Sequence, residues 1–179
     1  MAECPDNIKL CFYANVTGGG GVYRAGDRIV HPMHGAGVIV SIVSRKLNGA
    51  VREYYQMELP NGNMMVMIPT DHAEEIGVRP VVDSGEAVRI MELLGSLEAD
   101  MSPNWNHRYR ENMSRLKSGD LVEVARVVKG LYLRDRSRGL STGERKMLHA
   151  AKDILVSELV LAQGLSYETV EKRINLLMK

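Results

Sequence analysis

The sequence predicts an α+β protein in which a small antiparallel β-barrel is followed by an all-α helical bundle. Three observations predict this order. Residues 23–79 are rich in Val, Ile and turn dipeptides, whereas apolar residues recur at helical spacing from residue 83 onwards. The charge changes at the same place, because residues 1–83 carry a net charge of −2 and residues 84–179 a net charge of +3. We therefore expect a β domain at residues 22–80 and a helical domain at residues 81–179.

The first 21 residues form a leader that ends in four glycines, Gly18 to Gly21. Glycine loses much backbone entropy on ordering, so a flexible tail is expected here. Cys4 and Cys11 lie in this leader and no C-x-x-C pair occurs, which argues against a disulfide framework and a zinc finger. No basic segment leads into an apolar run, and the longest apolar stretch is too short to cross a membrane. We expect a cytoplasmic protein without membrane contact.

Four or five short strands are expected in the β domain, among them residues 28–31, 35–43, 51–59 and 64–68. Asn48-Gly49 and the Pro-Asn-Gly-Asn sequence at residues 60–63 mark turns, because Asn and Gly tolerate positive φ. The third strand alternates, and the residues that share its expected buried face are Val51, Tyr55, Met57 and Leu59. So few strands enclose a core only by curling toward a small barrel.

Five helices are expected in the second half, each opened by a residue whose side chain can cap it. They should begin after Asp83, Asn104, Asp120, Ser141 and Ser166. Asp83 and Ser141 are each followed three residues later by Glu, which is the spacing of a capping box. The apolar residues between the caps recur every three or four positions, as in a compact helical bundle.

No catalytic or metal-binding pattern stands out. His31 and His34 flank Pro32-Met33, and His72 lies elsewhere, without the Cys or paired carboxylates of a metal centre. We expect these histidines to shape a turn between two strands. There is no G-x-S-x-G sequence, and the glycines lack the strand–glycine–helix context of a nucleotide-binding loop. An enzyme, a cofactor and a metal are therefore not expected.

The only tryptophan, Trp105, falls in the first turn of the second expected helix, beside Arg108 and Arg110. Two interpretations are open. Trp105 heads a stripe at helical spacing that continues with Tyr109, Met113 and Leu116, which favours a buried ring with arginines in surface ion pairs. Alternatively, the helix N-terminus and its arginines approach DNA phosphates, and an exposed indole contacts unstacked bases.

Residues 26–37, Gly-Asp-Arg-Ile-Val-His-Pro-Met-His-Gly-Ala-Gly, resemble the opening of the CarD/CdnL family of bacterial transcription regulators. Further segments resemble the same family: Ile68-Pro69, residues 74–79, Asn104-Trp105, Arg108-Tyr109 and residues 138–148. These segments occur in the family's order from about Tyr23 to Leu161. The resemblance therefore covers both expected domains.

The resemblance implies a Tudor-like N-terminal domain that binds the β subunit of RNA polymerase, similar to the domain of transcription-repair coupling factor. It also implies a helical domain that binds promoter DNA in the minor groove at the upstream edge of the transcription bubble, largely without sequence specificity. Such a protein stabilises the open complex at initiation. It acts by binding, without bond chemistry.

The site residues that the resemblance implies fall into two groups. Those expected to contact DNA are the wedge Trp105, the phosphate clamps Arg108 and Arg110, the neighbouring His107, and Arg145. Those expected to contact RNA polymerase are Arg45, Lys46, Leu47 and Met67. Met67 stands where some members carry an arginine, so an apolar contact or none is expected there. His107 stands where arginine is frequent, which would make one contact pH-dependent.

Two alternatives remain open from the sequence. The first is a protein–protein adaptor on RNA polymerase, without direct DNA contact and with Trp105 buried. The second is a free nucleic-acid-binding protein with no polymerase tether. Salt-dependent binding to forked DNA would distinguish the transcription regulator from the adaptor. Retention on the isolated β subunit would distinguish it from a free nucleic-acid-binding protein. No base-reading helix and no dimer symmetry are indicated, so a monomer is expected.

Overall fold

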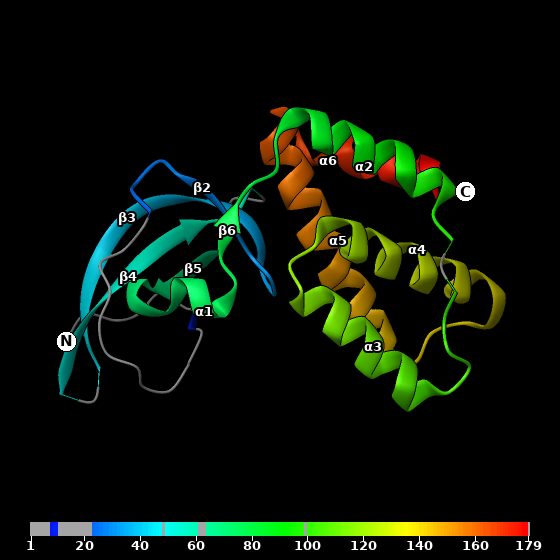
Figure 1. Ribbon diagram of the computed structural model, residues 1–179, viewed down its shortest axis with the longest axis horizontal. Coiled ribbons are helices and arrows are strands. Elements are labelled where there is room, and N and C mark those ends of the chain that lie inside the picture. The colour runs from blue at the N-terminus through cyan, green and yellow to red at the C-terminus, as the bar shows by residue number, and fades with distance from the viewer. Residues whose placement is uncertain (1–7, 11–22, 48, 61–63, 99, 179) are drawn as a thin grey trace.

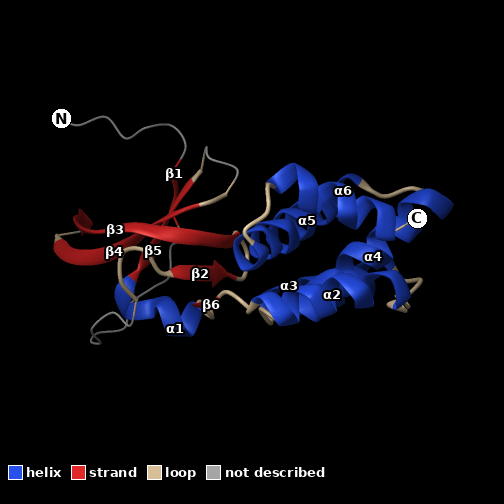
Figure 2. Ribbon diagram, turned by 90° about the horizontal axis from the view of Figure 1, so that it is seen from above, coloured by secondary structure: helices blue, strands red, loops and turns tan. Residues whose placement is uncertain are grey.

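The computed structural model describes residues 8–10, 23–47, 49–60, 64–98 and 100–178. A β-rich part is followed by a helical part, which confirms the expected α+β class (Figures 1 and 2). The strands are β1 (Ile8–Leu10), β2 (Arg28–His31), β3 (Gly35–Leu47), β4 (Ala50–Glu58), β5 (Met65–Pro69) and β6 (Arg79–Pro80). The helices are η1 (Thr70–His72), α1 (Ala73–Ile76), α2 (Ser84–Ser96), α3 (Trp105–Lys117), α4 (Leu121–Arg138), α5 (Thr142–Gln163) and α6 (Tyr167–Leu177).

The strands form one sheet in the order β1-β5-β4-β3-β2-β6. Every neighbouring pair is antiparallel except β1 and β5, which run parallel. The long strand β3 is visibly curved, and its register with β4 shifts between Ile39 and Ser41, where a bulge increases the bend (Figure 1). The curled sheet encloses a core that includes Ile29, Ile39, Tyr55, Met57, Val66 and Ile68.

The β3–β4 hairpin differs from its expected form in two respects. β3 runs to Leu47 rather than ending near residue 43, because the two strands stay paired up to the turn, where Gly49 has a φ of 85°. Val51 is 68% exposed although it belongs to the expected buried face, since it lies beside the turn and beyond the core. Tyr54, which belongs to the opposite face, is buried.

Three residues of the leader form a strand. Ile8–Leu10 pair with the edge of β5, which would otherwise present unpaired N–H and C=O groups. At these residues the leader differs from the expected flexible tail, because this pairing provides it with hydrogen-bond partners. The other leader residues, 1–7 and 11–22, lie outside the described residues, and they include both cysteines and the four glycines.

The helical part follows the expected capping pattern closely. Each of the five long helices begins directly after its expected cap, and each cap side chain accepts a hydrogen bond from a backbone N–H of the first turn. Helix α5 contacts α2, α4 and α6, and it also contacts β3 of the β domain. Residues of all five helices line one core, among them Leu94, Leu116, Val128, Leu155 and Ile174. Among the helices in the described part of the chain, none is long and apolar enough to span a membrane.

The histidines of the β2–β3 turn have a structural role. The Nδ1 atom of buried His31 accepts a hydrogen bond from the Met33 amide at 3.1 Å, and the rings of His31 and His34 lie 4.5 Å apart. Burial and, to a smaller extent, the proximity of His34 lower the pKa of His31 to about 4. His31 is therefore neutral at physiological pH and shapes this turn, as expected. Within the described ranges, no three His, Cys, Asp or Glu side chains are grouped to hold a metal ion.

Candidate nucleic-acid interface

Trp105 lies where the N-termini of α3 and α5 meet. The side chain of Asn104 accepts a hydrogen bond from the His107 amide at 3.1 Å, so α3 begins at Trp105. The indole Nε1 donates a hydrogen bond to the hydroxyl of Ser141, the cap of α5, at 3.1 Å. The indole also stacks on the ring of Tyr109, with the two centroids 5.4 Å apart and an interplanar angle of 25°. Contacts from two helices thus fix the orientation of this ring.

The indole is exposed although its orientation is fixed. Trp105 is 44% exposed, whereas the buried face of α3 consists of Arg108, Asn112 and Leu116, spaced four residues apart. Trp105 is therefore not the first residue of a buried stripe. Of the two interpretations open from the sequence, the structure supports the exposed indole.

A buried ion pair lies behind this ring. Arg108 is 1% exposed and Glu144 is 3% exposed. The Nε atom of Arg108 donates to Oε1 of Glu144 at 2.7 Å, and its Nη1 donates to the carbonyl oxygen of Ser102 at 2.6 Å. The second oxygen of Glu144, Oε2, accepts from the amide and the hydroxyl of Ser141, at 3.1 and 2.8 Å. Hydrogen bonds thus run from Arg108 through Glu144 and Ser141 to Trp105.

Arg108 is not a phosphate clamp, which corrects the expectation from the sequence. Its guanidinium is buried, and its donors are used by Glu144 and by the carbonyl oxygens of Ser102 and Pro103. The helical period explains this position, because Arg108 shares the buried face of α3 with Leu116. Arg108 supports the exposed indole from within the helical domain.

The carboxyl of Glu144 is held in its ionised form. Burial by itself raises the pKa of this group, but the hydrogen bonds from the Ser141 amide, from Arg108 and from the Ser141 hydroxyl lower it below its usual value overall. The carboxylate therefore stays charged at neutral pH. The ion pair and the capping box of α5 both depend on that charge.

The other residues expected at DNA are exposed and lie on the same two helices. Arg110 is exposed and its Nε donates to the carbonyl oxygen of Asn106 at 3.3 Å. His107 is exposed, with its Nδ1 atom 3.2 Å from a carboxylate oxygen of Glu111. Arg145 is exposed in the first turn of α5. Because helix N-termini carry partial positive charge, two such termini and the exposed Arg110 and Arg145 make the surface around Trp105 suitable for an anion.

The residues expected at RNA polymerase do not all lie on the surface. Arg45 and Lys46 are exposed near the end of β3, beside the β3–β4 turn. The side chain of Leu47 lies outside the described residues. Met67 is only 3% exposed in β5, so its side chain offers no contact surface. Of the two outcomes expected for Met67, the structure supports the absence of a contact.

Comparison with known proteins agrees with both parts of the structure. Residues 23–82 match the CarD-like/TRCF RID domain, and residues 89–175 match the CarD C-terminal domain. A Bacillus subtilis (strain 168) protein named "Putative transcription factor YdeB" is 34% identical over 150 residues, which are 84% of this chain and 98% of that protein. The chain belongs to the CarD family. It is a CarD-like transcription regulator, and its N-terminal domain is of a type that interacts with RNA polymerase.

Sequence reasoning missed how the CarD-family helical domain holds its tryptophan. Ser141 and Glu144 were recognisable as a capping box, but nothing in their spacing indicates that the box also binds Trp105 and Arg108. Those contacts join residues 36 positions apart in the chain. One signal for the ion pair was present in the sequence. Arg108 lies on the same helix face as Leu116, and a cation on a buried face needs a buried partner.

Proposed function

We propose that this CarD-family protein binds the β subunit of RNA polymerase through its β domain and promoter DNA through its helical domain. It acts at the upstream edge of the transcription bubble, where it stabilises the open complex, in the cytoplasm and as a monomer. The observation that carries the proposal is the exposed indole of Trp105, held by Ser141 and Tyr109 among exposed cations. The adaptor alternative expects this side chain in the core. The function needs no bond chemistry and no cofactor.

The mechanism is a shift of the equilibrium between the closed and the open promoter complex. An indole that stacks on unstacked bases binds the open complex better than the closed one, and this difference in affinity favours open DNA. Base–aromatic stacking is worth about 1 to 3 kcal/mol, or roughly 5-fold to 150-fold in an equilibrium constant. Tethering to polymerase raises the effective concentration at the DNA, so the DNA contact itself can be weak.

The experiment that tests this proposal compares forked and fully paired promoter DNA. Trp105 is the only tryptophan, so its fluorescence reports directly on the indole. We expect tighter binding to the fork, with a change in Trp105 fluorescence that the paired duplex does not produce. Equal affinities and an unchanged fluorescence would contradict a wedge.

The β3–β4 hairpin supports the polymerase half of the proposal. Arg45 lies directly opposite Arg52 in the register, beside exposed Lys46 and Val51. Basic side chains gathered beside this turn would attract an acidic partner surface. Arg52 therefore joins Arg45 and Lys46 as a candidate contact that sequence reasoning did not single out.

Reversing the charge of Arg45 should weaken binding to the isolated β subunit. We expect Arg45→Glu to raise the dissociation constant by about tenfold or more, because it places an acid against the proposed acidic surface. The matched control is Arg24→Glu, an exposed arginine in the turn before β2. Biolayer interferometry on immobilised β subunit measures both. Equal losses in the two variants would show that only total charge matters.

Removing the charge of Arg145 should lower the salt dependence of DNA binding. For Arg145→Ala we expect the slope of log K against log salt concentration to become less steep by about 1, as for one lost phosphate contact. The control is Arg89→Ala, since Arg89 is an exposed arginine on α2 whose guanidinium lies 3.6 Å from Glu86. Fluorescence anisotropy at several salt concentrations gives the slopes. An unchanged slope for Arg145→Ala would remove this residue from the interface.

A further inference from the structure

One helix connects the surroundings of Trp105 with the β domain. The N-terminal end of α5 carries Ser141 and Glu144, which hold the indole. The C-terminal half of the same helix carries Ser157 and Glu158, which contact the β domain. Glu144 and Glu158 are fourteen residues apart, so the helical rise separates them by about 21 Å.

The first contact between the domains is an ion pair between a partly exposed arginine and a buried carboxylate. Glu158 is fully buried in α5, and it accepts two hydrogen bonds from the guanidinium of Arg79 in β6, with Nη2 to Oε2 at 2.9 Å. The same carboxylate accepts from the backbone amide of Val82 at 3.2 Å. Such a pair fixes direction as well as distance, because a guanidinium and a carboxylate meet in one plane.

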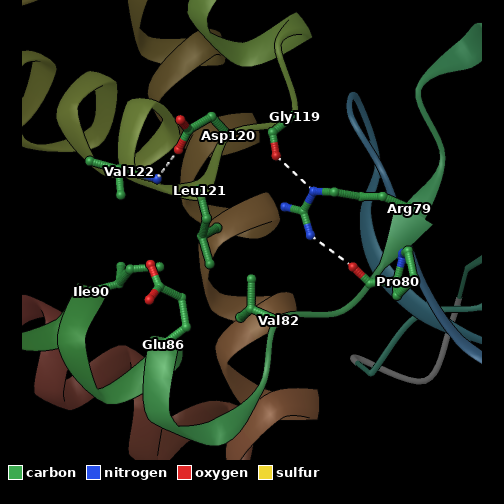
Figure 3. Close-up of a pocket in the computed structure, with 9 residues that line it drawn as sticks. All are labelled: Arg79, Pro80, Val82, Glu86, Ile90, Gly119, Asp120, Leu121 and Val122. Atoms are coloured by element: carbon green, nitrogen blue, oxygen red, sulfur yellow. Dashed lines mark hydrogen bonds between the residues drawn. The ribbon is translucent and has the colours of Figure 1, made fainter.

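Arg79 also reaches a third element. Its Nε donates to the carbonyl oxygen of Gly119, in the turn between α3 and α4, at 2.8 Å, as Figure 3 shows. Beside this contact lies an open pocket of about 280 Å³, and Pro80, Ile90 and Leu121 are among the residues that line it. Side chains do not fill the junction on this side. We therefore assign the relative orientation of the two domains on this side to the polar contacts of Arg79.

Three further contacts hold the β domain against α5 at other points. The hydroxyl of Ser157 accepts a hydrogen bond from the buried amide of Ala36 in β3 at 2.9 Å. Gly35 packs so closely that an added Cβ would lie 3.1 Å from the Cα of Ile154 and would overlap the Ser157 hydroxyl. The guanidinium of Arg28 in β2 donates to the carbonyl oxygen of Leu161 at 2.8 Å.

We propose that α5 is a rigid spacer between the two domains. The ion pair of Glu158 with Arg79 and the close packing of Gly35 on Ser157 hold this helix against the β domain. The helix thereby fixes the position of Trp105 relative to bound polymerase. Contacts from three strands, β2, β3 and β6, reach one helix and leave little freedom for the domains to rotate. Glu158 and Gly35 are thus positioning residues. The inference rests on the proposed function, because a fixed orientation matters only when both domains are bound.

Two variants weaken the contacts between α5 and the β domain in independent ways, and each has a matched control. Glu158→Gln removes the charge that pairs with Arg79, and Glu168→Gln makes the same change at an exposed position of α6. Gly35→Ala inserts a methyl group against Ser157 at a residue whose φ is +88°. Gly26→Ala imposes the same backbone strain, at a φ of +96°, where an added Cβ meets no atom within 4 Å.

The first readout is the distance between the domains. A dye is attached to the full-length protein at Val51→Cys, after Cys4 and Cys11 have been replaced by Ser. Energy transfer from Trp105 to this dye gives the distribution of distances between the two domains. Val51 is 68% exposed, so the dye is tolerated there. We expect a narrow distribution for the parent and both controls. Glu158→Gln and Gly35→Ala should broaden it, and unchanged distributions in both would overturn the inference.

The second readout separates positioning from general stability. Glu158→Gln and Gly35→Ala should bind isolated β subunit and isolated forked DNA as the parent does, yet prolong the lifetime of open complexes about tenfold less, because a loose tether lowers effective concentration. If folded variants with broadened distances prolong the lifetime fully, the inference is wrong although the proposed function stands. If the parent protein itself fails to prolong the lifetime, the proposed function fails and the inference falls with it.

Discussion

Trp105→Ala is expected to lose the preference for forked over fully paired DNA, by a factor of roughly 5 to 150, the range that base–aromatic stacking covers. The loss should be confined to the fork, because only unstacked bases present a face to the indole. The dependence of affinity on salt should stay the same, since the substitution removes no charge. Anisotropy titrations with the two DNAs at several salt concentrations measure both quantities.

The control for this substitution is Leu176→Ala, which removes an apolar side chain that is 65% exposed on α6. This control should keep the fork preference of the parent protein. A Trp105→Ala variant that binds the fork as well as the parent would leave the exposed indole without a role in DNA binding. Circular dichroism should show the same helix content in all three proteins.

Arg108→Met is expected to lower the free energy of unfolding by about 3 to 5 kcal/mol, because it leaves the buried Glu144 carboxylate with Arg134, at 3.6 Å, as its nearest cation. Arg110→Met, two residues further along α3 and exposed, should change stability by less than about 0.5 kcal/mol. Urea unfolding followed by the fluorescence of Trp105 reports on the helical domain, which contains both positions. Similar losses in both variants would contradict a buried ion pair at Arg108.

A double variant and the pH dependence of unfolding distinguish the stabilising contribution of the ion pair from that of side-chain packing. Arg108→Met combined with Glu144→Met should cost less than the sum of the two single changes, because neither member of this pair then stays buried without the other. The pKa of Glu144 is lowered in the folded protein, so its stabilising contribution is present above the usual pKa of a glutamate. That contribution is lost as the pH falls through the lowered value. Arg108→Met should therefore lose less stability on acidification than the parent.

The elements that sequence reasoning predicted well are those with local signals. The caps Asp83, Asn104, Asp120, Ser141 and Ser166 each open a helix, because capping depends on residues within one turn. The β3–β4 hairpin follows from Asn48-Gly49 in the same way. Strand β1 was missed because its pairing with β5 joins residues far apart in the sequence.

Residue type alone singled out Trp105 as a candidate site residue, but it could not show which neighbouring side chains are buried. Trp105 stood out because the chain has one tryptophan, but the periodicity of α3 by itself favoured a place in the core. The same helix buries Arg108, whose neighbours in sequence make it look like a surface cation. Glu158 was missed for the same reason. A carboxylate among Leu155, Leu159 and Ile154 signals a buried partner, but its identity, Arg79, needs the tertiary structure.

The most direct test of the central claim is the lifetime of promoter open complexes formed by the cognate RNA polymerase. It is measured by competitor challenge with no addition, with this protein, and with Trp105→Ala. We expect the protein to prolong the lifetime, and the variant, although folded and bound to polymerase, largely not to do so. Equal lifetimes with the protein and with the variant would contradict it.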